Sequence, residues 1–171
     1  HGVHKRWFKN GQLEVEMHYQ KGKKEGHALW YYKDGKKDVE GYFENDRQDS
    51  LWTYYRKDGG KGNQGHYKDG KMEGEWTWWY GNGAVWKKGH YKNGKKHGHW
   101  IKYFEDGTRF HEGDFKNGEE HGLWTSWYQS GQKKSQGKFN QGKMHGKWEG
   151  WFRNGNPKYR LHYDKGVKDG E

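Results

Sequence analysis

A 24-residue period runs through almost the whole chain and limits its fold more than any other feature. Glycine recurs on one grid, with a single serine substitution, at Gly2, Gly26, Ser50, Gly74, Gly98, Gly122, Gly146 and Gly170. Seven copies follow without insertion or deletion, at residues 2–25, 26–49, 50–73, 74–97, 98–121, 122–145 and 146–169, and residues 170–171 begin a further copy. Such self-similarity is typical of repeat proteins, in which each unit packs on its neighbours. The sequence therefore predicts one continuous repeat array over residues 1–171.

Two turn signals, about a dozen residues apart, divide each copy. In the copy at 98–121 they are EDGT at 105–108 and KNGE at 116–119. Asp-Gly and Asn-Gly favour two-residue hairpin turns in which both central residues have positive φ. The 29 glycines and the lack of a 3.6-residue apolar period disfavour helix. We therefore expect an all-β chain, an elongated single-layer antiparallel β-meander of tandem 24-residue hairpin repeats.

The composition indicates which residues form the core. Only 28% of the chain is hydrophobic, which is too little for a conventional two-layer core, whereas 19% is aromatic. A disordered chain would be poor in aromatic residues, so we expect aromatic rings to pack the repeats together. The absence of cysteine excludes disulfides and thiolate metal sites. No apolar run approaches the length of a membrane-spanning helix.

The spacing of the turns predicts a register. With each copy numbered from its opening glycine, turns centred on positions 9–10 and 20–21 place position 3 opposite the glycine at position 16. The same turns place position 16 opposite the opening glycine of the next copy. By alternation, positions 1, 3, 7, 16 and 18 share one face, and position 6 points to the other. Position 3 is predicted to form a structural aromatic column, in which a ring lies over glycine backbone, at Trp52, Trp76, Trp100, Trp124 and Trp148.

Position 6 is aromatic in every copy and lies on the face that is otherwise polar. Aromatic rings in a regular row can stack on sugars or nucleobases. We therefore predict a binding row of exposed rings at Trp7, Tyr31, Tyr55, Trp79, Tyr103, Trp127 and Trp151.

The repeated pattern resembles one known family. The motif G-x-W-x-x-[YW]-[YF]-x-[ND]-G, followed by G-x-[YF]-x-[ND]-G-K-x-x-G, is similar to the MORN-repeat variant family of bacteria and covers the entire chain. The resemblance implies one hairpin per repeat and no catalytic activity, and some members of that family are described as antitoxin components. The pattern is broken at His4, Met17, Asp46, Ser50 and Leu161, which predicts atypical ends and an irregular junction near residues 45–50.

Charged residues and histidines favour no enzyme or metal site. The net charge is +10, but the copies at 26–49 and 98–121 are net negative, unlike a uniformly basic nucleic-acid groove. Basic pairs interleave with aromatic residues at Lys87-Lys88, Lys95-Lys96 and Lys133-Lys134, which is typical of a solvated strand face or, alternatively, of an anion-binding surface. His97, His121 and His145 recur once per copy, about 10 Å apart, too far to share one metal ion. We therefore expect no catalytic residue, no metal and no cofactor.

These observations leave three functions open. The first is a non-catalytic scaffold for another protein, including the toxin neutralisation that the family resemblance implies. The second is binding of carbohydrate or cell envelope through the aromatic rows, and the third is binding of anionic lipid or nucleic acid through the positive charge. An open strand at each end also allows end-to-end self-association. His1 at repeat position 24 and the new copy at 170–171 predict a segment of a longer array, and the sequence leaves the compartment open.

Overall fold

The strands follow the repeat. A computed structural model describes residues 1–169 and contains two compact units, at residues 1–83 and 84–169. The first unit consists of β1 (Gly2–Trp7), β2 (Leu13–Gln20), β3 (Lys23–Tyr31), β4 (Lys37–Glu44), β5 (Arg47–Tyr55), β6 (Lys61–Lys68) and β7 (Lys71–Trp79). The second consists of β8 (Val85–Lys92), β9 (Lys95–Tyr103), β10 (Arg109–Lys116), β11 (Glu119–Trp127), β12 (Lys133–Asn140), β13 (Lys143–Trp151), β14 (Pro157–Asp164) and β15 (Val167–Asp169).

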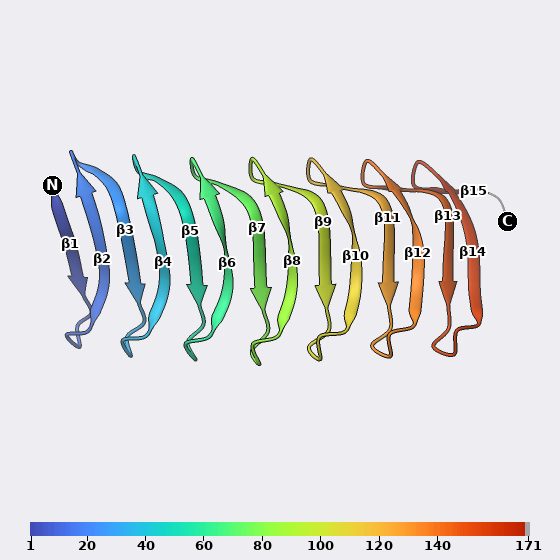
Figure 1. Cartoon of the computed structure of the whole chain (residues 1–171), viewed down its shortest axis with the longest axis horizontal. Coiled ribbons are helices and arrows are strands. Elements are labelled where there is room, and N and C mark those ends of the chain that lie inside the picture. The colour runs from blue at the N-terminus through green and yellow to red at the C-terminus, as the bar shows by residue number, and fades with distance from the viewer. Residues whose placement is uncertain (170–171) are drawn as a thin grey trace. The chain divides into compact units, whose positions relative to one another are not determined.

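Each unit is an open antiparallel sheet in which neighbours in sequence are neighbours in space (Figure 1). The two kinds of turn lie at opposite ends of the strands (Figure 1). The prediction of an all-β antiparallel meander of 24-residue hairpin repeats is therefore confirmed. The start of a further copy, at residues 170–171, lies outside the described residues.

The second turn of each copy has the predicted conformation, but the first does not. At the second turn both central residues have positive φ, as at Asn117 (54°) and Gly118 (95°), which defines a type I′ hairpin. At the first turn only the glycine does, as at Gly11 (82°). There the amide of Phe8 donates to the carbonyl oxygen of Gln12 at 2.8 Å, and that of Gly11 to Phe8 at 3.0 Å. These bonds close a three-residue loop with a left-handed glycine, so the two-residue prediction for this turn is wrong.

The register agrees with the prediction within a copy and differs between copies. Trp52 lies opposite Gly65 of its own copy, as expected. Gly65, however, also lies opposite Trp76 of the next copy, and not opposite that copy's opening glycine. The register shifts between Gly65 and His66, because Gly74 and the residue after it bulge out of β7. Gly74 has φ of +68° there, so the opening glycine serves a left-handed bulge rather than a cross-strand glycine pair.

The bulge places each tryptophan of the column over the glycine of the preceding copy. A Cβ atom on Gly65 would overlap the indole ring of Trp76, which is 1% exposed. The indole nitrogen of Trp76 donates to the carbonyl oxygen of His66 at 3.0 Å. Tyr67 packs edge-on against the indole, with centroids 5.1 Å apart. Each column tryptophan therefore buries its ring and satisfies its N–H on the copy before it.

The first copies contain the reverse arrangement. Met17 occupies the glycine position, and Ala28 occupies the tryptophan position opposite it. Both are buried and form a small core with Val15. A large residue and a small one are therefore required at this contact, but either strand can supply the large one.

Candidate functional site

The sheet face opposite the tryptophan column carries the side chains at positions 4, 6, 12 and 15, here called the polar–aromatic face. Position 15 lies in register with position 4 of its own copy and of the next, as Glu40 does with Leu29 and Thr53. Because side chains alternate along a strand, the ring at position 6 emerges on this same face. The contacts described next confirm the predicted separation of positions 3 and 6.

Glu40 is the centre of one hydrogen-bonded group on the polar–aromatic face. Its carboxylate accepts from the Lys37 ammonium at 2.9 Å and from the Tyr55 hydroxyl at 3.1 Å, and His27 Nε2 lies 3.1 Å from Oε1. Burial alone would raise the pKa of Glu40, but the hydrogen bonds from Lys37, Tyr55 and His27 outweigh it and leave that pKa lowered. The carboxylate is therefore charged at neutral pH and holds the ring of Tyr55 in one orientation.

Other copies use an amide at the same place. Gln64 accepts from the Lys61 ammonium at 3.1 Å and donates to the Thr53 hydroxyl at 2.8 Å. The Lys61 ammonium lies 5.8 Å from the ring centroid of Trp79, within the range of a cation–π contact. Gln136 repeats both amide bonds with the corresponding lysine and threonine. A cation, an acceptor and a ring therefore recur on this face at repeat spacing.

The predicted binding rings differ in exposure. Trp7 is 55% exposed, whereas Trp127 is 7% exposed beneath the guanidinium of Arg109, which lies 4.6 Å from its ring centroid. The prediction of an exposed ring is therefore wrong at Trp127, because a cation covers it. The remaining five rings are half-buried, at Tyr31, Tyr55, Trp79, Tyr103 and Trp151.

The tryptophan column is not available to a ligand. Its exposed fractions lie between 1% and 8%, at Trp52, Trp76, Trp100, Trp124 and Trp148. These rings pack neighbouring copies together, so an aromatic contact with a partner must come from other rings, among them those at position 6.

The histidines form no compact ligand set. His99 Nδ1 lies 3.3 Å from a carboxylate oxygen of Asp114, and His145 Nδ1 lies 3.7 Å from Asp164. Among residues 1–169, no three His, Asp or Glu side chains converge in a group that could hold a metal ion. In the same part of the chain, no helix is long and apolar enough to cross a membrane.

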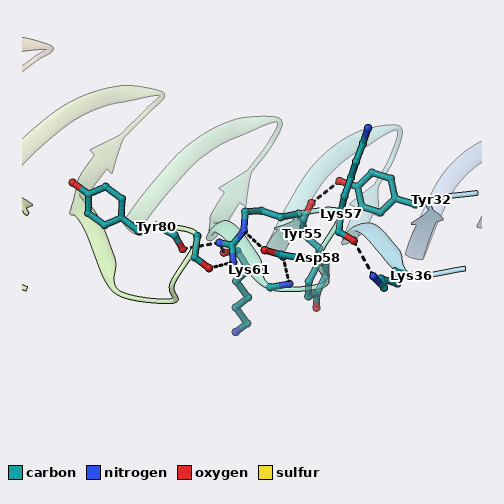
Figure 2. Close-up of polar contacts among 10 residues, drawn as sticks. Tyr32, Lys36, Tyr55, Lys57, Asp58, Lys61 and Tyr80 are labelled. Atoms are coloured by element: carbon teal, nitrogen blue, oxygen red, sulfur yellow. Dashed lines mark hydrogen bonds and ion pairs between the residues drawn. The ribbon is translucent and has the colours of Figure 1, made fainter. Parts of the chain in front are cut away.

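Position 7 links successive copies at the end of the sheet that the first turns form (Figure 2). The Tyr32 hydroxyl donates to the carbonyl oxygen of Tyr55 at 2.7 Å. In the next copy Arg56 replaces the ring, and its guanidinium donates to the carbonyl oxygens of Tyr80 and Gly81 at 2.8 and 3.1 Å. Arg56 is the one residue at position 7 that is not aromatic, and that exception is the signal in the sequence from which this contact could have been found.

Comparison with known proteins identified a family. The profile of the MORN repeat variant family matches residues 1–21, 24–45, 72–93, 96–117, 120–141 and 144–165. The unmatched segment between 45 and 72 contains Asp46, Ser50 and Arg56, three of the departures from the repeat pattern. A search of curated proteins gave no match to the chain.

Proposed function

Because the chain belongs to the MORN repeat variant family, we propose that it is a non-catalytic scaffold that binds another protein through its polar–aromatic face. The observation that supports this most is the row of aromatic rings at position 6, five of which are half-buried. Tyr55 lies beside the Glu40 carboxylate and Trp79 beside the Lys61 ammonium. Tyrosine and tryptophan held in fixed orientations are the residues that most often anchor protein interfaces. Toxin neutralisation is a narrower form of the same proposal.

The placement of the rings favours a protein over a polysaccharide. The column that could have formed an uninterrupted stacking track is buried. The row at position 6 is interrupted at Trp127, and its neighbours differ from copy to copy, as Glu40 and Gln64 do. A surface that varies along its length suits a partner with a defined surface better than a uniform polymer does.

Affinity capture from a native lysate, read by mass spectrometry at low and high salt, tests the proposal. We expect the chain to retain one protein at both salt concentrations and to lose it when Trp79 or Trp151 is changed to serine. Phe152→Ser is the matched control, because Phe152 is 48% exposed but lies at position 7, in the first-turn end of the sheet. Circular dichroism of each variant separates loss of the partner from loss of the fold.

Two outcomes would contradict the proposal. If Phe152→Ser releases the protein as completely as Trp79→Ser does, the polar–aromatic face is not the binding surface. If the chain retains only nucleic acid, lipid or glycan, and salt releases it, the positive charge dominates binding.

A further inference from the structure

The sheet face that carries the tryptophan column differs between the two units at one pair of cross-strand positions. Position 14 lies in register with position 5 of the next copy, and in the first unit this pair is Val15 with Trp30, Val39 with Tyr54 and Asn63 with Trp78. In the second unit the pair is Lys87 with Lys102, His111 with Ser126 and Ser135 with Gly150. The ring that covers the column at position 5 in the first unit is therefore replaced by a cation or a small residue.

A cavity opens where these rings are missing. Its volume is about 140 Å³. A water molecule occupies about 30 Å³ in the liquid, so the cavity can accept a group of several heavy atoms. Its charged and aromatic lining includes Lys87, Lys96, Lys102, His111, Trp100 and Glu120.

The lining concentrates positive charge against aromatic walls. The Lys96 ammonium lies 4.8 Å from the ring centroid of Trp100 and 4.6 Å from that of Phe115. Lys87 and Lys102 face each other across adjacent strands, where like charges destabilise a sheet. Burial, and then the nearby lysines, lower the pKa of both Lys87 and Lys96. Glu120 offsets part of this positive charge, and a ligand that brings further negative charge into the cavity would offset more of it.

We propose that this cavity binds a compact dianionic oxyanion, namely phosphate or the phosphate monoester of a soluble molecule. Three lysine ammonium groups and one glutamate carboxylate give the lining a net charge of +2 when all are ionised, which a phosphate dianion neutralises. Lysine binds phosphate as a point charge that donates several hydrogen bonds. The proposal does not depend on the protein-binding role of the opposite face.

Residues found at the same positions in other copies can replace the lysines of the cavity without disturbing the packing of the repeats. Lys102→Tyr and Lys87→Val install the residues that the chain already uses at the corresponding positions, Tyr54 and Val39. We expect isothermal titration calorimetry at neutral pH, with ionic strength held constant by chloride, to show saturable binding of one inorganic phosphate per chain. Each variant is expected to weaken phosphate binding about tenfold or more, because it removes one charge-assisted hydrogen bond.

Controls separate the cavity from general attraction to a basic chain. Lys138 is exposed in β12 of the same unit, so Lys138→Gln is expected to leave phosphate affinity within about twofold of the unchanged chain. O-phosphoserine in place of phosphate distinguishes a monoester from the free ion, and acetate is expected to bind more weakly because it carries one charge. The melting temperatures of Lys102→Tyr and Lys87→Val are expected to equal or exceed that of the unchanged chain, since each change removes like-charge repulsion.

Three results would overturn the proposal. The first is the absence of saturable phosphate binding to the unchanged chain. The second is affinity that survives both Lys102→Tyr and Lys87→Val. The third is equal weakening by Lys138→Gln, which would show that net charge, and not the cavity, attracts the anion.

Discussion

Changing Gly65 to alanine tests the contact that joins one repeat to the next. The backbone at Gly65 is not left-handed, so alanine brings no conformational strain, and the lower entropy of its unfolded chain contributes about 0.5–1 kcal/mol of stability. The added Cβ, however, overlaps the buried indole of Trp76. If the ring left its place entirely, the loss of about 150–250 Å² of burial would cost about 4–6 kcal/mol. Partial adjustment of an overpacked core costs about 1–3 kcal/mol. Because the Cβ would overlap several ring atoms, the upper end applies, and after the entropy gain we expect a net loss of about 2 kcal/mol.

Urea unfolding, followed by tryptophan fluorescence, measures this loss as a change in the midpoint at constant slope. Gly81→Ala is the matched control, because Gly81 has no left-handed backbone and nothing lies within 4 Å of the added Cβ. Its free energy of unfolding should stay within about 0.5 kcal/mol of the unchanged chain.

The first copies provide a rescue for the same contact. Trp76→Ala alone should cost about 3–5 kcal/mol. Adding Gly65→Met to it recreates the pairing of Met17 with Ala28, and we expect the double variant to be more stable than Trp76→Ala alone. The reasoning is refuted if Gly65→Ala is as stable as the control, or if Gly65→Met and Trp76→Ala are simply additive.

Three further predictions concern the junction of the second to fourth copies. Arg56→Lys should lower the free energy of unfolding by about 1.5–3 kcal/mol, because one ammonium cannot reach both the Tyr80 and Gly81 carbonyl oxygens, and a shift in urea midpoint measures it. Ser50→Gly should raise that free energy by about 1 kcal/mol, because Ser50 has φ of +59°, and an unchanged midpoint would count against strain there. Burial, and then the nearby Asp38 carboxylate, raise the pKa of Tyr32 to about 12. Since that folded pKa lies above the unfolded value of 10.0, its contribution to stability is complete below about pH 10 and is lost as the pH rises toward 12. Tyr32→Phe should therefore remove part of the alkaline loss of stability and one late-ionising phenol from an ultraviolet titration.

The period and the turn residues were enough to predict the strands, because Asn-Gly and Asp-Gly favour hairpin connections of either length. They were not enough to predict the bulge at Gly74, since the same glycine fits either a cross-strand pair or a left-handed backbone. That ambiguity led to the wrong partner for Gly65 between copies. The first turn was misjudged for a similar reason, because Asn10-Gly11 suits a two-residue turn as well as a three-residue loop that ends in a left-handed glycine.

The sequence predicted which face of the sheet carries the rings at position 6, but not how exposed each ring is. Alternation correctly separated position 6 from position 3, but the burial of Trp127 depends on the rotamer of Arg109 above it. The lysine-lined cavity was even harder to predict from the sequence. Lys87 and Lys96 were recognised as basic residues among aromatics, but Lys102 becomes the neighbour of Lys87 only through the register of β8 with β9. Side-chain cover and cross-strand neighbours depend on packing, which a repeat pattern does not encode.

The differences between the copies distinguish the positions that pack the repeats together from the positions that are free to vary. Positions at which the copies agree join one repeat to the next. One example is the ring of Trp100, which lies over Gly89 of the preceding copy. Another is the amide of Gly118, which donates to the carbonyl oxygen of Lys96 at 2.8 Å. A change at such a position disturbs the stacking of repeats, whatever the chain binds. Position 5, by contrast, varies from tryptophan to lysine to glycine and leaves the strands in register. Substitutions at position 5 can therefore change what the chain binds with little effect on the packing of the repeats. Comparing the unchanged chain with Lys102→Tyr, which installs the residue found at Tyr54, measures this in one substitution.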